Sequence, residues 1–257
     1  MSYYKDIKRV KQHLLKGSNQ IRRALEDYAR DKTTHKEGVT FKQSRMVQGL
    51  ALAKRGIVDN NLYNSRKQVV KVQAGFSFAS DHSSSLTWGG GRYWKEICLL
   101  LAGMHDLADK LGVLSSSALV RLRWGDDTRS DCSTRQVPHM IRLLDHNQKW
   151  REPYFWKVKE RRPCGGTSLI CYAESALKMA RELPDCTHRI AFFLTDGDCE
   201  EKIYLESLRQ SAAAEGILLV GIGLGINGKG LPNGISGNSA EDISQQMCKV
   251  LTNLLKG

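Results

Sequence analysis

Three short segments of the sequence combine carboxylate and hydroxyl side chains in a way that could bind a metal ion. They are Asp81-His82-Ser83-Ser84-Ser85, Gly165-Gly166-Thr167 and Thr195-Asp196-Gly197. Carboxylate and hydroxyl oxygens are hard ligands, which suit Mg²⁺, Mn²⁺ or Ca²⁺ and disfavour zinc. The predicted metal ligands are Asp81, Ser83, Ser85, Thr167 and Asp196.

These segments must be brought together by the elements that precede them. The β-branched and aromatic run 69–78 predicts a strand ahead of Asp81, and the run 189–194 predicts a second strand ahead of Thr195. Thr167 stands directly before a helix predicted over 168–182. The carboxyl ends of parallel strands lie at one edge of a sheet, where ligands bind, so the oxygens are expected to converge there.

The rest of the chain continues the alternation of strands and helices. Further strands are predicted at 117–124 and 216–222, and further helices at 92–110, near 137–145, at 200–214 and at 239–255. This order predicts an α/β fold, a Rossmann-like doubly wound and mostly parallel sheet covered by helices on both faces.

A basic segment precedes this domain. Residues 1–71 contain 17 Lys and Arg against 6 Asp and Glu, whereas the other 186 residues contain 22 against 21. We therefore predict a basic helical and extended arm over 1–67 and a domain over 68–257. The arm begins with a helix over 5–31, weakened or broken at Gly17-Ser18, and continues as extended segments or turns over 32–66. An apolar stripe predicts that the helix packs on the domain: Ile7, Val10, Leu14, Ile21, Leu25 and Tyr28.

Composition excludes several classes of protein. With 41% hydrophobic and 26% charged residues, the chain is expected to fold. Its longest apolar stretches, such as 97–104, are far shorter than the ~20 residues of a membrane span. The N-terminus has no apolar region typical of a secretory signal. Seven cysteines without CxxC spacing favour a reducing compartment, so a cytoplasmic location is expected.

The three oxygen-rich segments together resemble the metal-ion-dependent adhesion site of von Willebrand factor type A domains. The family pattern is Asp-x-Ser-x-Ser after the first strand, a separate Thr, and an Asp-Gly turn after a later strand. Asp81, Ser83 and Ser85 match the first element, Thr167 the second and Asp196 the third. The resemblance covers about residues 68–256 and implies a type A fold with a bound divalent cation.

A finer resemblance is to the type A domain of the cobaltochelatase CobT subunit. It is based on a basic insertion that holds Trp150 and Trp156, on Gly221-Ile222-Gly223 at the end of the last strand, and on the final helix from Asp242 to Leu251. The acidic linker of that family is absent, and His82 replaces its usual Asn. The chain is therefore expected to be a shorter stand-alone relative, such as one from a phage or mobile element.

These resemblances imply a metal-dependent protein-interaction adaptor that works with a hexameric AAA+ ATPase. A cation held mostly by neutral hydroxyls would accept an acidic residue of the partner, and Trp150 and Trp156 are expected to add apolar contact near the metal. The chain would then be a non-catalytic subunit of a cobaltochelatase-like enzyme of cobalamin biosynthesis. Two alternatives stay open: an adaptor of a MoxR-type remodelling ATPase without chelation, and a nucleic-acid-associated protein that uses residues 1–67, which is not favoured.

One further segment has the glycine spacing of a phosphate-binding loop but lacks other residues that such a loop needs. The segment 223–230 fits both GxGxxG and GxxxxGK, but Gly230 stands where a Walker A loop needs Ser or Thr. Pro232 and Gly237 also prevent the helix that should follow at once. We predict a loop here, with no cofactor site and no catalytic residues in the chain.

Overall fold

A computed structural model describes residues 3–31, 40–41, 63–64, 74–124, 136–186, 188–197 and 202–256. The chain divides into two compact units, residues 1–25 with 72–257, and residues 26–71. In the second unit the described residues are the end of the first helix and an antiparallel pair, β1 (Thr40–Phe41) with β2 (Tyr63–Asn64). Most of the segments predicted over 32–66 therefore lie outside the described residues, and the domain boundary at 67 and 68 stays a prediction.

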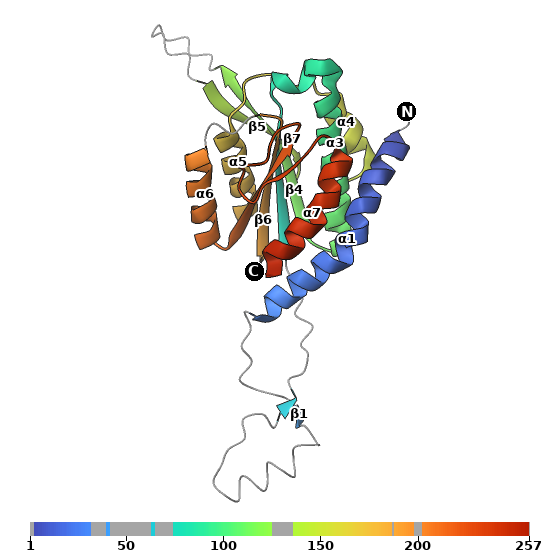
Figure 1. Ribbon diagram of the computed structural model, residues 1–257, viewed down its shortest axis with the longest axis vertical. Helices are drawn as coiled ribbons and strands as arrows, with labels where there is room; N and C mark the ends of the chain where they lie inside the picture. Colours follow the sequence, from blue (N-terminus) through green and yellow to red (C-terminus); the bar gives the residue numbers. More distant parts are fainter. Residues whose placement is uncertain are drawn as a thin grey trace, which may run out of the picture. The chain divides into compact units, whose positions relative to one another are not determined.

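The first unit is built on a six-stranded sheet in the order β5-β4-β3-β6-β7-β8 (Figure 1). Every neighbouring pair is parallel except β4 with β5, which is antiparallel. The strands are β3 (Ala74–Asp81), β4 (Leu114–Trp124), β5 (Gln136–Leu144), β6 (His188–Thr195), β7 (Ile217–Leu224) and β8 (Ile235–Gly237). The predicted mostly parallel sheet is confirmed, and β3 lies near its middle. The first part of the predicted run 69–78 is outside the described residues.

The helix predicted near 137–145 is wrong, because these residues form the edge strand β5. Its pairing with β4 places Pro138 opposite Leu122. Proline lacks the N–H that a central strand needs, but an edge strand tolerates it since one side of the strand is unpaired. Residues 139–143 are half-buried, which is typical of a strand that is covered incompletely.

Helices cover both faces of the sheet. On one side of Figure 1 lie α1, α3, α4 and α7, and on the other lie α5 and α6. The helices are α1 (Tyr3–Asp31), α3 (Trp88–Leu111), α4 (Glu152–Lys159), α5 (Leu169–Arg181), α6 (Lys202–Ala214) and α7 (Ala240–Lys256). All were predicted except α4, which begins with Pro153 in its first turn and buries Phe155 and Val158. None of the described helices is long and apolar enough to cross a bilayer.

The segment after β7 contains no helix before Ala240, as predicted for 223–230 and the residues that follow. Backbone bonds instead tie it to the sheet: the Gly221 N–H donates to the Pro232 carbonyl at 2.7 Å, and the Gly225 N–H donates to the Gly237 carbonyl at 2.9 Å. Three of its residues form the short strand β8, which the sequence reasoning missed.

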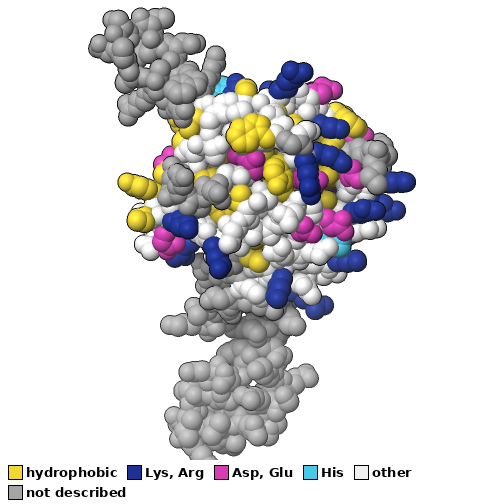
Figure 2. Space-filling model, turned by 45° about the horizontal axis from the view of Figure 1, so that its top comes forward, with side chains coloured by type: hydrophobic (Ala, Val, Ile, Leu, Met, Phe, Trp, Pro, Cys, Tyr) yellow, Lys and Arg dark blue, Asp and Glu magenta, His cyan; other side chains and the backbone are white. Residues whose placement is uncertain are grey.

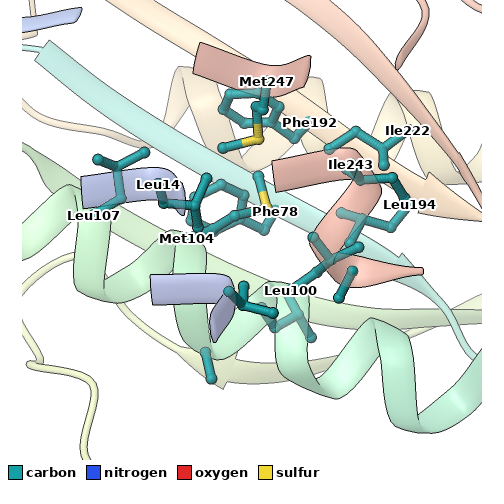
Figure 3. Close-up of a cluster of buried hydrophobic side chains, with 14 of the residues drawn as sticks. Leu14, Phe78, Leu100, Met104, Leu107, Phe192, Leu194, Ile222, Ile243 and Met247 are labelled. Atoms are coloured by element: carbon teal, nitrogen blue, oxygen red, sulfur yellow. The ribbon is translucent and has the colours of Figure 1, made fainter. Parts of the chain in front are cut away.

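The larger hydrophobic core lies between the sheet and the helices α1, α3, α4 and α7, and Figure 3 shows part of it. Phe78 and Phe192 of the sheet are fully buried against Leu14 of α1, Met104 of α3 and Met247 of α7. The described part of the predicted apolar stripe of α1 is buried in this core: Ile7, Val10, Leu14, Ile21 and Leu25. The expectation that the N-terminal helix packs on the domain is therefore confirmed.

The predicted break at Gly17-Ser18 is wrong, because α1 is continuous through both residues. Gly17 is instead a packing residue: a Cβ added there would collide with the side chain of Cys248 on α7. Gly103 plays the same part on α3, where an added Cβ would lie 2.7 Å from Val10 of α1. The two glycines let three helices approach one another closely.

We predict that Gly17→Ala destabilises the protein although alanine is the better helix former by about 1 kcal/mol. The added methyl group must displace α7, which costs about 1–3 kcal/mol by the usual scale of overpacking. Urea denaturation measures the difference, with Asn19→Ala on the exposed side of the same helix as control. A Gly17→Ala protein more stable than the wild type would show that α1 and α7 are not in close contact.

Candidate functional site

The predicted site residues lie at the carboxyl edge of the sheet, where β3 and β6 run side by side. Asp81 is the last residue of β3, and Thr195 is the last residue of β6. The register pairs Ser80 with Leu194, so Asp81 and Thr195 end neighbouring strands at the same level. Asp196 follows directly, and the 3₁₀ turn η1 (Ser84–Thr87) carries Ser85 back over the strand ends.

A chain of short contacts joins four of the five predicted ligands. The Ser83 N–H donates to Asp81 Oδ1 at 2.7 Å. The hydroxyls of Ser83 and Ser85 are 2.8 Å apart, and the Ser85 hydroxyl donates to Asp196 Oδ1, also at 2.8 Å. Two carboxylates and two hydroxyls that lie up to 115 residues apart in sequence therefore come together in one cluster.

Thr167 lies beside this cluster, next to Tyr172 and Gly197. Its hydroxyl interacts with that of Tyr172, and its methyl group lies 2.8 Å from the position that a Cβ on Gly197 would take. The segment before it is pinned to the site by the backbone. Cys164 N–H donates to the His82 carbonyl at 2.8 Å, and Ser84 N–H donates to the Gly165 carbonyl at 3.1 Å.

Two residues that the sequence reasoning did not assign to the site hold the Asp81 carboxylate. The Tyr172 hydroxyl donates to Oδ1 at 2.8 Å, and the Thr195 hydroxyl donates to Oδ2 at 3.0 Å. Thr195 in turn accepts a bond of 2.9 Å from the Gly197 N–H. The position of Thr195 directly before Asp196 could have indicated its role, whereas Tyr172 is brought in by the packing of α5.

Burial shapes the electrostatics of the cluster. It raises the pKa of Asp81 to about 6, the charge of Asp196 adds to the rise, and the hydrogen bonds from Ser83 and Tyr172 oppose it. Burial also raises the pKa of Asp196. The buried carboxylate of Asp81 and the half-buried one of Asp196 lie close together and disfavour each other's charge, and a bound cation would relieve that cost.

His82 does not belong to the oxygen cluster. Its ring is buried and packs against Trp94 of α3, with ring centroids 5.2 Å apart. Burial lowers the pKa of His82 to about 4, with a contribution from the charges of Arg121 and Arg161. The side chain is thus neutral at pH 7 and serves the packing beneath the site.

The expectation that Trp150 lies near the metal is wrong. Trp150 stacks on the buried His105 ring at a centroid distance of 4.7 Å, and His105 bonds to the Ser115 and Ser117 hydroxyls. Ser115 precedes Val120, the partner of Asp81, by five residues of β4, which corresponds to roughly 16 Å along the strand. Trp156 lies on α4, where its indole donates to Glu152.

The donors of the cluster fit a hard cation. Among the described residues, no group of three or more His, Cys, Asp or Glu side chains could hold a metal ion. The cluster instead offers hydroxyls beside two carboxylates, all oxygen ligands of the kind that Mg²⁺, Mn²⁺ or Ca²⁺ prefers.

The strand order and the helices on both faces of the sheet match the Rossmann-like α/β fold of von Willebrand factor type A domains. A scan of protein-family models and a search of curated proteins find no match to the chain.

Solved structures give the comparison instead. The pilus adhesin SpaC from Lactobacillus rhamnosus GG is 10% identical over 75% of this chain and 32% of its own, with a TM-score of 0.50. The proximal thread matrix protein 1 of the mussel byssus, with a zinc-occupied MIDAS motif, is 16% identical over 71% of this chain and 46% of its own, at 0.49. A von Willebrand factor type A protein from Catenulispora acidiphila is 17% identical over 72% and 43%, at 0.42. The chain thus matches less than half the length of these proteins, and the likeness concerns the fold.

We predict that Asp81→Asn removes a pH dependence of stability from the metal-free protein. A raised pKa means that the folded state binds the proton more tightly than the unfolded state. The stability that it contributes is complete below about pH 4 and is lost as the pH rises through about 6. In EDTA, the wild type should lose on the order of 2–3 kcal/mol relative to Asp81→Asn between pH 4 and pH 7. Asparagine keeps an oxygen for Ser83 and Tyr172.

Denaturant titrations of both proteins at each pH make this measurement. Carboxylates remote from Asp81 titrate equally in the two proteins and cancel in the difference, whereas the interaction of Asp81 with Asp196 is part of the measured effect. If the free energy of unfolding varied with pH in the same way in the two proteins, burial would not raise the pKa of Asp81.

Proposed function

We propose that the chain is a metal-dependent protein-interaction module. Mg²⁺, or Mn²⁺ or Ca²⁺ in its place, would be held by Asp81, Ser83, Ser85, Thr167 and Asp196, and a carboxylate of a partner protein would complete the coordination. The single observation that carries the proposal is the chain of oxygen contacts from Ser83 through Ser85 to Asp196.

The charges of the cluster support a binding role. Two carboxylates are the only charged groups among the five proposed ligands, so the protein can at most balance the charge of a divalent cation and supplies no excess of negative charge. Hydroxyl ligands leave the cation a strong acceptor for a further anionic oxygen. A partner Asp or Glu meets that demand.

The surface beside the site supports a protein partner. Trp88 begins α3 three residues after Ser85, and 73% of its side chain is exposed. Ile203 and Tyr204, in the first turn of the helix that follows Asp196, are 84% and 68% exposed. Large exposed apolar residues are typical anchors of protein interfaces. Here they follow Ser85 and Asp196 closely in the sequence.

The partner that the sequence resemblance favours is a hexameric AAA+ ATPase. The chain would act as its adaptor, either in a cobaltochelatase-like machine or in a MoxR-type remodelling machine without chelation. The support for this finer part is the likeness of the basic, Trp-containing insertion, of 221–223 and of α7 to the CobT subunit.

We predict that calorimetry detects binding of Mg²⁺ or Mn²⁺ to the wild type and none to Asp81→Ala, since the buried carboxylate is the central ligand. The double variant Ser83→Ala/Ser85→Ala should bind at least about tenfold more weakly. Ser84→Ala is the matched control, because the Ser84 hydroxyl donates to the Gly165 carbonyl and not to the cluster. Equal affinity of the double variant and the control would contradict the ligand assignment.

We predict that association with a AAA+ ATPase encoded beside this chain requires the metal. Pull-down should succeed with Mg²⁺ and fail with EDTA, and Thr167→Ala should weaken it by removing one hydroxyl without a change of charge. Trp88→Ala should weaken the association with the ATPase but leave the affinity for the metal unchanged, because the indole is proposed to contact the partner and not the metal. Binding that ignores both EDTA and Thr167→Ala would place the partner on another surface.

A further inference from the structure

One face of α1 carries a line of exposed cations, here called the basic strip: Lys5, Lys8, Arg9, Lys16 and Arg23. The spacing of these residues follows the helical repeat, so they share the face opposite the buried stripe. From Lys5 to Arg23 the strip is about 27 Å long at 1.5 Å per residue. In Figure 2, Lys and Arg side chains gather on the side of the molecule where α1 lies in Figure 1.

No carboxylate compensates the basic strip within the side chains that the structure describes on α1. Asp6 is the one acid there, and it pairs with Lys95 of α3 at 2.6 Å. Lys11, which is not in the strip, pairs with Asp106 of α3. Asp6 and Lys11 of the helix thus form ion pairs with α3, whereas the cations of the basic strip face solvent.

Beside the strip, α1 and α7 form the walls of a groove of about 410 Å³. The groove is lined by side chains that donate hydrogen bonds and by no Asp or Glu. Lys16 and Gln20 line it from α1, and Gln245, Lys249 and Asn253 line it from α7. Lys16 belongs to both the strip and the groove, so the two features are continuous.

We propose that the basic strip and this groove bind the phosphodiester backbone of a nucleic acid, independently of sequence. A row of cations over about 27 Å suits a polymer with regularly spaced charge, and neutral amides beside the lysines can donate to phosphate oxygens or bases. An acidic protein segment is the alternative occupant, and the competition experiment below distinguishes it from nucleic acid.

Fluorescence anisotropy with the full-length protein and labelled 20-nucleotide single strands of DNA and RNA, and a 20-base-pair duplex, tests the proposal. Binding should weaken steeply with salt, by about 0.7 in the logarithmic slope for each phosphate contact on a single strand. Lys16→Glu/Lys249→Glu should weaken binding by at least tenfold and lower the slope by about 1.4, the share of two contacts. Preference among the three probes identifies the form of nucleic acid that is bound.

Lys178→Glu provides the matched control, because Lys178 is an exposed lysine of α5 on the opposite face of the sheet. It should lower affinity far less than a single Lys16→Glu. Unfolding midpoints verify that the variants are folded. The proposal is overturned if no probe binds at low salt, if the double variant binds like Lys178→Glu, or if polyglutamate of equal charge displaces the oligonucleotide more strongly than unlabelled nucleic acid does.

Discussion

The carboxylate of Asp81 is fully buried at the end of the central strand β3, and the functional edge of the domain is organised around it. An ionised carboxylate away from water is costly unless donors surround it. Here they come from three separate elements: the backbone of the following loop, Thr195 of β6 and Tyr172 of α5. These bonds fix the relative positions of β3, β6 and α5, and the second carboxylate, Asp196, keeps the charge incompletely balanced. The same arrangement that strains the metal-free protein prepares it for a cation.

Whereas buried Asp81 needs hydrogen-bond donors, the core between the sheet and α1, α3 and α7 depends on close apolar packing. The N-terminal helix completes the core through Leu14 and Ile21, and glycines on α1 and α3 remove the side chains that would keep the helices apart. Because one face of α1 is buried in the core, the exposed cations of the basic strip lie on the opposite face. Packing and surface charge are thus two consequences of one helical pattern.

Much of this arrangement follows from local patterns in the sequence. The strands that end at Asp81 and Thr195 are short apolar runs followed by polar residues. Because parallel strands end at one edge of a sheet, the sequence alone predicts that Ser83, Ser85 and Asp196 lie close together. Local patterns were misleading where tertiary context decides. The edge strand β5 contains a proline and a mixed pattern, and its nature depends on the pairing with β4. Gly17 weakens a helix in isolation but is required where α7 approaches, and Trp150 is held by His105, which no spacing rule connects to it. Tyr172 was missed for the same reason, because its bond to Asp81 depends on how α5 lies on the sheet.

We propose that the hydroxyls of Ser83 and Ser85 and the two carboxylates form one cation site. Anomalous X-ray diffraction from crystals of the protein grown with Mn²⁺ tests it most directly. We expect a strong anomalous peak about 2 Å from both serine hydroxyls, at the bonding distance of a small hard cation, and next to Asp81 and Asp196. The absence of a peak at this position, with the serine and aspartate contacts unchanged at saturating Mn²⁺, would contradict it.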